Sequence, residues 1–92
     1  MAQTIDEITI KYEEDGQLIV DELDKEILTR GAWTTILFKY RQWDNKIDDF
    51  GPDKFTIRRY RKMKGEFKQQ SKFNISNKEQ AEKIVLTLKK WI

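Results

Sequence analysis

The chain has 92 residues, of which 38% are hydrophobic and 37% charged, and a formal net charge of +2 at pH 7. This length makes one small domain, near the lower limit for a core that is stable without a second subunit. The sequence contains no cysteine and no histidine, which removes disulfides, zinc–thiolate sites, thiol nucleophiles and the commonest general base. The carboxylates fall in a loop and an acidic segment, with no pair placed by secondary structure, so we expect no enzyme, no metal site and no cofactor.

The charge is distributed unevenly along the chain. Residues 1–28 carry a net charge of −7, and residues 29–92 carry +9. An acidic segment beside a basic body is typical of a polyanion-binding surface with an acidic flank that modulates it. We expect an acidic N-terminal segment over residues 1–21 and a nucleic-acid-binding domain over residues 22–92.

The sequence also bears on location. Residues 1–15 lack a basic start and an apolar run, so we expect no secretory signal. No apolar stretch approaches the ~20 residues that a membrane helix needs. These observations predict an intracellular protein with no membrane partner.

In chain order, the first elements are weakly marked. Residues 1–21 alternate loosely between apolar and polar side chains around a Glu-Glu-Asp-Gly turn signal, which predicts either a hairpin or a single edge strand with a flexible tail. Residues 21–31 end in the apolar pair Ile27 and Leu28. A strand bounded by Gly31 and a helical turn remain competing interpretations of this stretch.

Residues 32–43 give the longest strand signal, because they are rich in β-branched and aromatic side chains. Alternation places Thr34, Ile36, Phe38 and Tyr40 on one side, which we expect to be core. Residues 44–53 follow as a loop with four aspartates. Their spacing does not match a calcium-binding loop.

Residues 55–76 predict a hairpin of two strands, with Lys64 and Gly65 at the turn. Each strand has an apolar side and a cationic side if its side chains alternate. Residues 54–73 contain one acid, Glu66, and eight basic residues: Lys54, Arg58, Arg59, Arg61, Lys62, Lys64, Lys68 and Lys72.

The last element is an amphipathic helix. Ser76 and Glu79 have the spacing of a capping box, and apolar residues then recur at three- and four-residue intervals up to Trp91. The predicted fold class is therefore α+β. A curved antiparallel sheet of four strands, or of five or six if residues 1–21 contribute, precedes one C-terminal helix that covers it.

The stretch IRRYRKMKGEFKQQSKFNISNKEQAEKIVLTLKKW, from Ile57 to Trp91, resembles the C-terminal domain of the transcriptional coactivator family called positive cofactor four. That family has a strand of the form I-R-x-Y, then G-E-x-K, a lysine-bearing strand ending in I-S, and a terminal helix. The segment from Glu26 to Trp43 is similar to its first two strands, so the resemblance covers roughly residues 22–92. Two departures are Arg61, where the family often has tryptophan, and the longer loop at residues 44–53.

The resemblance implies a homodimer held largely through the C-terminal helices and single-stranded DNA bound in basic, aromatic grooves of the sheet. Carried over, it points to Arg58, Tyr60, Lys68 and Lys72, with Lys39 near a basic position of the preceding strand. A basic track for phosphates with aromatic faces for bases is what single-strand binding needs.

Side-chain alternation in three successive strands predicts one binding surface, on the side of the sheet away from the helix. Its expected residues are Lys39, Arg41, Trp43, Arg58, Tyr60, Lys62, Lys68 and Lys72. Trp33 and Trp91 are expected in the core or a dimer interface, and Arg59 and Arg61 are left out because they point the other way. RNA as the ligand, and a protein–protein adaptor without a nucleic-acid role, are the alternatives.

Overall fold

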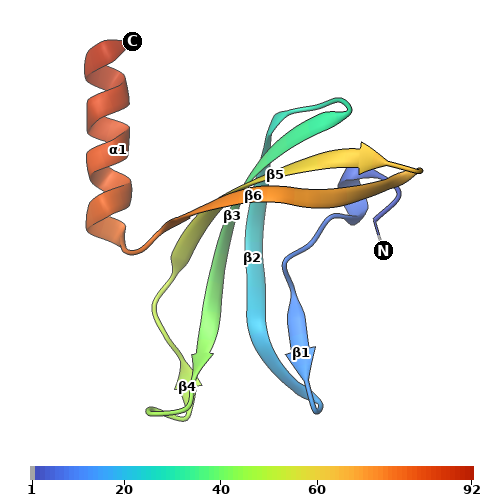
Figure 1. The fold of residues 1–92 in the computed structure, drawn as a ribbon. Coiled ribbons are helices and arrows are strands. Elements are labelled where there is room, and N and C mark those ends of the chain that lie inside the picture. Colours follow the sequence, from blue (N-terminus) through green and yellow to red (C-terminus); the bar gives the residue numbers. More distant parts are fainter. Residues whose placement is uncertain (1) are drawn as a thin grey trace.

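The computed structural model describes residues 2–92, and it shows a curved antiparallel sheet followed by one C-terminal helix (Figure 1). The sheet order is β1-β2-β3-β5-β6, and the short β4 pairs with the end of β3. The expected α+β fold class is confirmed, including the additional strands. The elements are a 3-10 turn η1 (Ile5–Glu7), β1 (Tyr12–Glu14), β2 (Gln17–Thr29), β3 (Trp33–Asp44), β4 (Asp49–Phe50), β5 (Lys54–Met63), β6 (Glu66–Ile75) and α1 (Lys78–Trp91).

The N-terminal part of the chain had two predictions with open alternatives, one for residues 1–21 and one for residues 21–31. Residues 12–29 form the β1–β2 hairpin, turned at Asp15 and Gly16, whose φ angles are 50° and 78°. Residues 21–29 are strand and not a helical turn, because they belong to the long strand β2. The boundary expected between residues 21 and 22 falls inside this strand.

The β5–β6 hairpin agrees with the sequence pattern at its turn. Lys64 and Gly65 have φ angles of 53° and 80°, and two successive positive φ values suit a two-residue hairpin turn. Its pairing contains a bulge, however: Arg59 lies opposite Ser71, and the next pair is Tyr60 with Gln69. The bulge reverses the side to which the following β6 side chains point.

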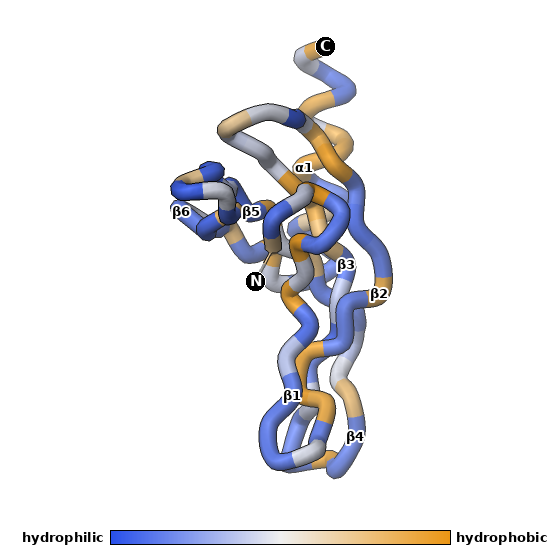
Figure 2. The backbone as a smooth tube through the Cα atoms, turned by 90° about the vertical axis from the view of Figure 1, so that its right-hand side faces the viewer, coloured by the Kyte–Doolittle hydropathy of each residue, from blue (hydrophilic) through white to orange (hydrophobic). Residues whose placement is uncertain are grey.

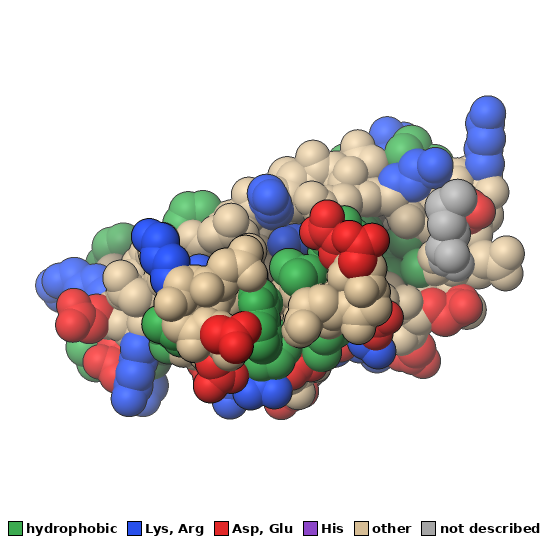
Figure 3. Space-filling view, turned by 90° about the horizontal axis from the view of Figure 1, so that it is seen from below, with side chains coloured by type: hydrophobic (Ala, Val, Ile, Leu, Met, Phe, Trp, Pro, Cys, Tyr) green, Lys and Arg blue, Asp and Glu red, His purple; other side chains and the backbone are tan. Residues whose placement is uncertain are grey.

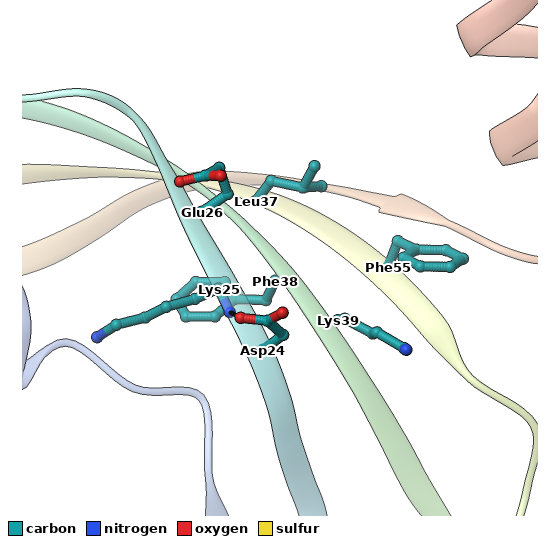
Figure 4. Close-up of a pocket in the computed structure, with 7 residues that line it drawn as sticks. All are labelled: Asp24, Lys25, Glu26, Leu37, Phe38, Lys39 and Phe55. Carbon is teal, nitrogen blue, oxygen red and sulfur yellow. Dashed lines mark hydrogen bonds between the residues drawn. The ribbon is translucent and has the colours of Figure 1, made fainter.

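We call the two sides of the sheet the core face and the helix face. The core face carries the buried side chains of β3 that were expected to be core, including Ile36 and Phe38, which are fully buried. The helix face carries Leu37 and Phe55 on the side toward α1, and Figure 4 shows Leu37 and Phe38 pointing to opposite sides of β3.

The N-terminal segment, residues 2–11, closes the core face. Ile8 is 2% exposed and belongs to the same cluster as Ile36, Phe38 and Tyr60. The Lys25 ammonium donates hydrogen bonds to the backbone carbonyls of Asp6 and Ile8, at 3.0 and 2.7 Å. The segment is therefore part of the core and not a flexible tail.

Helix α1 is capped one residue later than expected. Asn77, and not Ser76, is the N-cap, and its side chain accepts a hydrogen bond from the Gln80 amide at 2.8 Å. The Gln80 side chain in turn accepts from the Ser76 amide, also at 2.8 Å. Asn77 thus caps the Gln80 amide as a capping-box N-cap does, but the Gln80 side chain reaches back to Ser76, one residue before the N-cap, and not to the N-cap itself.

The expectation that the helix covers the sheet is wrong. Helix α1 stands beside the sheet (Figure 1), meets it mainly through β6, and has no buried residue among those described. The molecule measures 42 × 40 × 17 Å and is correspondingly flat. A small sheet with one face left open is the situation in which a second subunit supplies missing burial.

Candidate nucleic-acid interface

The eight predicted binding residues do not share one face of the sheet. Residues directly opposite each other on neighbouring strands project to the same side. Lys39 pairs with Phe55 and so lies on the helix face, whereas Arg58 pairs with Ile36 and lies on the core face. The helix face therefore holds Lys39, Arg41, Trp43 and Lys68, and the core face holds Arg58, Tyr60, Lys62 and Lys72.

The expectation of one shared surface away from the helix is thus wrong, for two physical reasons. Strands β3 and β5 pair odd-numbered with odd-numbered residues, which separates Lys39 from Arg58. The bulge in the hairpin then separates Lys68, opposite Arg61, from Lys72, opposite Arg58.

Two of the helix-face cations are engaged with acidic side chains. The Arg41 Nε donates to Asp21 Oδ2 at 2.8 Å, and the Arg41 guanidinium carbon lies 4.1 Å from the centre of the Phe50 ring. The Lys39 Nζ lies 3.5 Å from Asp53 Oδ2. Partner carboxylates compete with phosphates for these charges.

The end of the sheet that carries the β1–β2 and β3–β4 turns is mixed in charge. In Figure 3, which views the molecule from this end, acidic side chains gather in groups among basic ones. A phosphate backbone gains less from such a surface than from a uniformly cationic one.

Both predicted aromatic residues are engaged within the protein. Tyr60 is 6% exposed and packs with the core. Burial raises the pKa of the Tyr60 hydroxyl, and the nearby Arg58 guanidinium partly offsets that rise. The Trp43 ring meets Phe50 edge-on, with ring centres 5.3 Å apart, and its Nε1 donates to Asn45 at 3.1 Å.

A different aromatic side chain, which was expected in the core or a dimer interface, lies exposed among cations. Trp33 is 42% exposed, and the guanidinium carbons of Arg59 and Arg61 lie 4.5 and 5.3 Å from the centre of its ring. Trp33 pairs with Arg61, which pairs with Lys68, so these residues form a row across β3, β5 and β6 on the helix face. We call Trp33, Arg59, Arg61 and Lys68 the Trp33 cluster.

The expected surface wrongly placed Lys68 and Arg61 on opposite sides of the sheet, although the turn chemistry indicates their pairing. A turn at Lys64 and Gly65 sets Arg61 opposite Lys68, as the structure has it. The pairing of Trp33 with Arg61 could not be predicted from the sequence. The connection between β3 and β5 contains its own strand, β4, and does not define the register of the two longer strands.

The hairpin that carries the cluster is almost free of neutralising acids. Within residues 2–92, Arg58, Arg59, Arg61, Lys62 and Lys72 form no ion pair, and Lys68 meets Glu66 only at 4.0 Å. Strand β6 is an edge strand, so one of its sides pairs with no other strand, and the backbone of the hairpin is coloured mainly hydrophilic in Figure 2.

The opposite end of the helix face is apolar. A groove of about 770 Å³ lies between α1 and the sheet. We call it the helix groove; it is lined from the sheet by Leu28, Leu37, Phe55, Ile57 and Ile75 and from the helix by Ala81, Ile84, Val85, Leu86 and Leu88, with the charged Lys78 and Glu82 at the start of the helix. Several of these side chains are strongly exposed, for example Val85 at 52% and Leu86 at 66%.

Other kinds of site are not seen in the described part of the chain. Among residues 2–92, no three Asp or Glu side chains are placed to hold a metal ion. No helix in the same range is long and apolar enough to cross a membrane.

Comparisons with models of protein families, with curated proteins and with solved structures find no match for this chain.

Proposed function

We propose that the protein binds single-stranded nucleic acid through the Trp33 cluster on the helix face of the β5–β6 hairpin, and that DNA is preferred over RNA as the ligand. The observation that carries the proposal is an exposed indole flanked by two guanidinium groups that have no acidic partner in the described residues. Planar guanidinium and indole groups stack on bases, and the same guanidinium groups bind phosphates.

The charge around the cluster supports a polyanionic ligand. Bound phosphates release counterions when lysine and arginine neutralise them, which favours binding to a surface without competing carboxylates. A single strand suits the cluster better than a duplex, because only unpaired bases expose their faces for stacking. No base-reading hydrogen-bond pattern is implied, so we expect weak sequence selectivity.

The proposal is consistent with the resemblance to positive cofactor four, but it places the binding site at different residues from those the resemblance implies. The family's tryptophan position corresponds to Arg61 here, and the structure places Trp33 directly across from Arg61 on the neighbouring strand. An aromatic side chain thus occupies the same part of the sheet from a different strand. A role in transcription, replication or repair is the corresponding biological expectation.

We further propose that the active species is a homodimer, with the helix groove of each copy occupied by the apolar side of α1 from the other. The apolar side of α1 forms one wall of the groove in each chain, so two copies related by a twofold axis can pack these walls against each other symmetrically. Exposed apolar surface of this kind is unusual on a monomer. The two Trp33 clusters of such a dimer would serve a longer strand than one cluster.

The test is a fluorescence-anisotropy titration with single-stranded DNA, duplex DNA and single-stranded RNA of one length and sequence, at about 50 and about 200 mM salt. We expect single strands to bind more tightly than duplex and to lose affinity steeply with salt. Salt-independent binding, or none to any of the three, would favour an adaptor role through the helix groove instead.

A further inference from the structure

A second hollow lies on the core face, away from the Trp33 cluster. It has a volume of about 450 Å³ and is bounded by the N-terminal segment, the β1–β2 hairpin, β3 and the two strands of the β5–β6 hairpin. We call it the strand pocket; it is lined by Thr9, Ile10, Lys11, Tyr12, Val20, Tyr40, Gln42, Arg58, Lys72 and Asn74. It shares no residue with the Trp33 cluster.

The lining supplies three cations from three separate elements: Lys11 from the N-terminal segment, Arg58 from β5 and Lys72 from β6. Arg58 and Lys72 are cross-strand partners, so their charges sit side by side. The Lys11 Nζ lies 3.6 Å from Glu13 Oε1, and an exposed ion pair of this kind contributes little free energy. Glu22 is the cross-strand partner of Tyr40 and accepts hydrogen bonds from the Thr9 hydroxyl and the Ile10 amide, at 2.8 and 3.2 Å.

Several donors in the pocket have no acceptor within residues 2–92. The Arg58 Nε is buried without a partner, while its Nη1 donates to Gln69 at 3.0 Å. The Asn74 Oδ1 accepts from the Thr56 hydroxyl at 2.8 Å, which leaves its amide NH₂ as a donor. A buried donor without an acceptor costs free energy, more so when it is charged, and an incoming anion is the group that relieves this cost.

From these features we infer that the strand pocket binds a phosphate monoester carried on a nucleoside. A monoester has more negative charge and more free oxygens than the diester inside a strand, and so makes fuller use of adjacent arginine and lysine donors. The volume exceeds what a phosphate needs and falls in the range of small-molecule sites. Tyr12, at 52% exposed, lies on the rim and offers a ring on which a base can stack.

The experiment is an ¹⁵N-labelled amide NMR titration of the full chain with adenosine 5′-monophosphate, inorganic phosphate and adenosine. We expect the monophosphate to shift the amides of residues 9–12 and 72–74, phosphate to do so more weakly, and adenosine to leave them unchanged. Lys72→Gln should weaken monophosphate binding at least about tenfold, as the loss of a charged hydrogen bond predicts, while Lys46→Gln should not. No shift in these amides with the monophosphate, or equal binding to Lys72→Gln, overturns the inference.

Two further arms identify the source of the monoester. If a 5′-phosphorylated oligonucleotide binds more tightly than its unphosphorylated twin, and Lys72→Gln removes the difference, the pocket holds a strand end. If the phosphorylated and plain oligonucleotides bind alike while the monophosphate still shifts the pocket, the ligand is a free nucleotide. Because the inference does not require the Trp33 cluster, Trp33→Ala should leave the monophosphate shifts intact whatever it does to strand binding.

Discussion

At the scale of single residues, substitution of Trp33 tests the proposed function most directly. Trp33→Ala should weaken single-strand binding by about 1–3 kcal/mol, the contribution of one stacked base. The side chain is 42% exposed, so the free energy of unfolding should fall by less than the loss expected for a fully buried tryptophan. Anisotropy titrations and urea unfolding of the same preparation measure both quantities.

Trp33→Phe is the matched control, because it keeps an aromatic face at the same place. It should retain most of the affinity that alanine loses. Equal affinity in wild type and Trp33→Ala would remove Trp33 from the binding site.

Ile8 tests the other role found at the level of single residues, the closure of the core by the N-terminal segment. Ile8 is 2% exposed, so Ile8→Ala should lower the free energy of unfolding by about 2–5 kcal/mol. Ile47→Ala makes the same chemical change at a loop position that is 58% exposed and should be nearly neutral. Similar urea midpoints for the two variants would contradict a structural role for the segment.

Residue patterns predicted burial in β3 better than they predicted the site. The alternation that marked Thr34, Ile36, Phe38 and Tyr40 as core held, since all four are buried. The aromatic ring of Tyr60 was assigned to the surface by the same reasoning and lies in the core. Alternation states which side chains share a side within one strand, but it does not say which of the two sides is covered.

At the scale of elements, the hairpin turn is the feature whose chemistry the sequence specified most fully. Gly65→Ala should destabilise the protein by about 1–2 kcal/mol, because Gly65 has a φ of 80° and a Cβ disfavours that conformation. The added Cβ meets no atom within 4 Å, so the loss comes from the backbone alone.

Gly51→Ala provides the comparison, since Gly51 has no positive φ and its added Cβ would stand 3.7 Å from the nearest atom, an ordinary contact. Thermal unfolding should show a clearly lower midpoint temperature for Gly65→Ala and almost no change for Gly51→Ala. The reverse order would contradict the turn geometry.

Two features at this scale were beyond the sequence. The hairpin bulge between Arg59 and Tyr60 moves Lys68 and Lys72 to different faces. The helix stripe was correctly read as apolar, but the stripe alone does not identify the surface it packs against. The missing information in both cases is tertiary or quaternary.

At the scale of the whole molecule, the open helix groove predicts self-association. Light scattering after gel filtration should give twice the chain mass of 11.1 kDa. Val85→Glu should shift the protein toward a monomer, because it places a charge in the apolar groove. Lys89→Glu adds the same residue to the helix outside the groove lining and should leave the dimer in place; a monomeric wild type would contradict the proposal.

The central claim is that the Trp33 cluster binds the phosphates and bases of a single strand, and the dependence of affinity on salt tests it most directly. Each neutralised phosphate contributes about −0.7 to the slope of log affinity against log salt. Arg59→Gln with Arg61→Gln should therefore reduce the steepness by about 1.4 per chain, whereas Lys46→Gln with Lys90→Gln, which removes the same charge elsewhere, should change it far less. Equal slopes for the two double variants, both folded, would contradict the account.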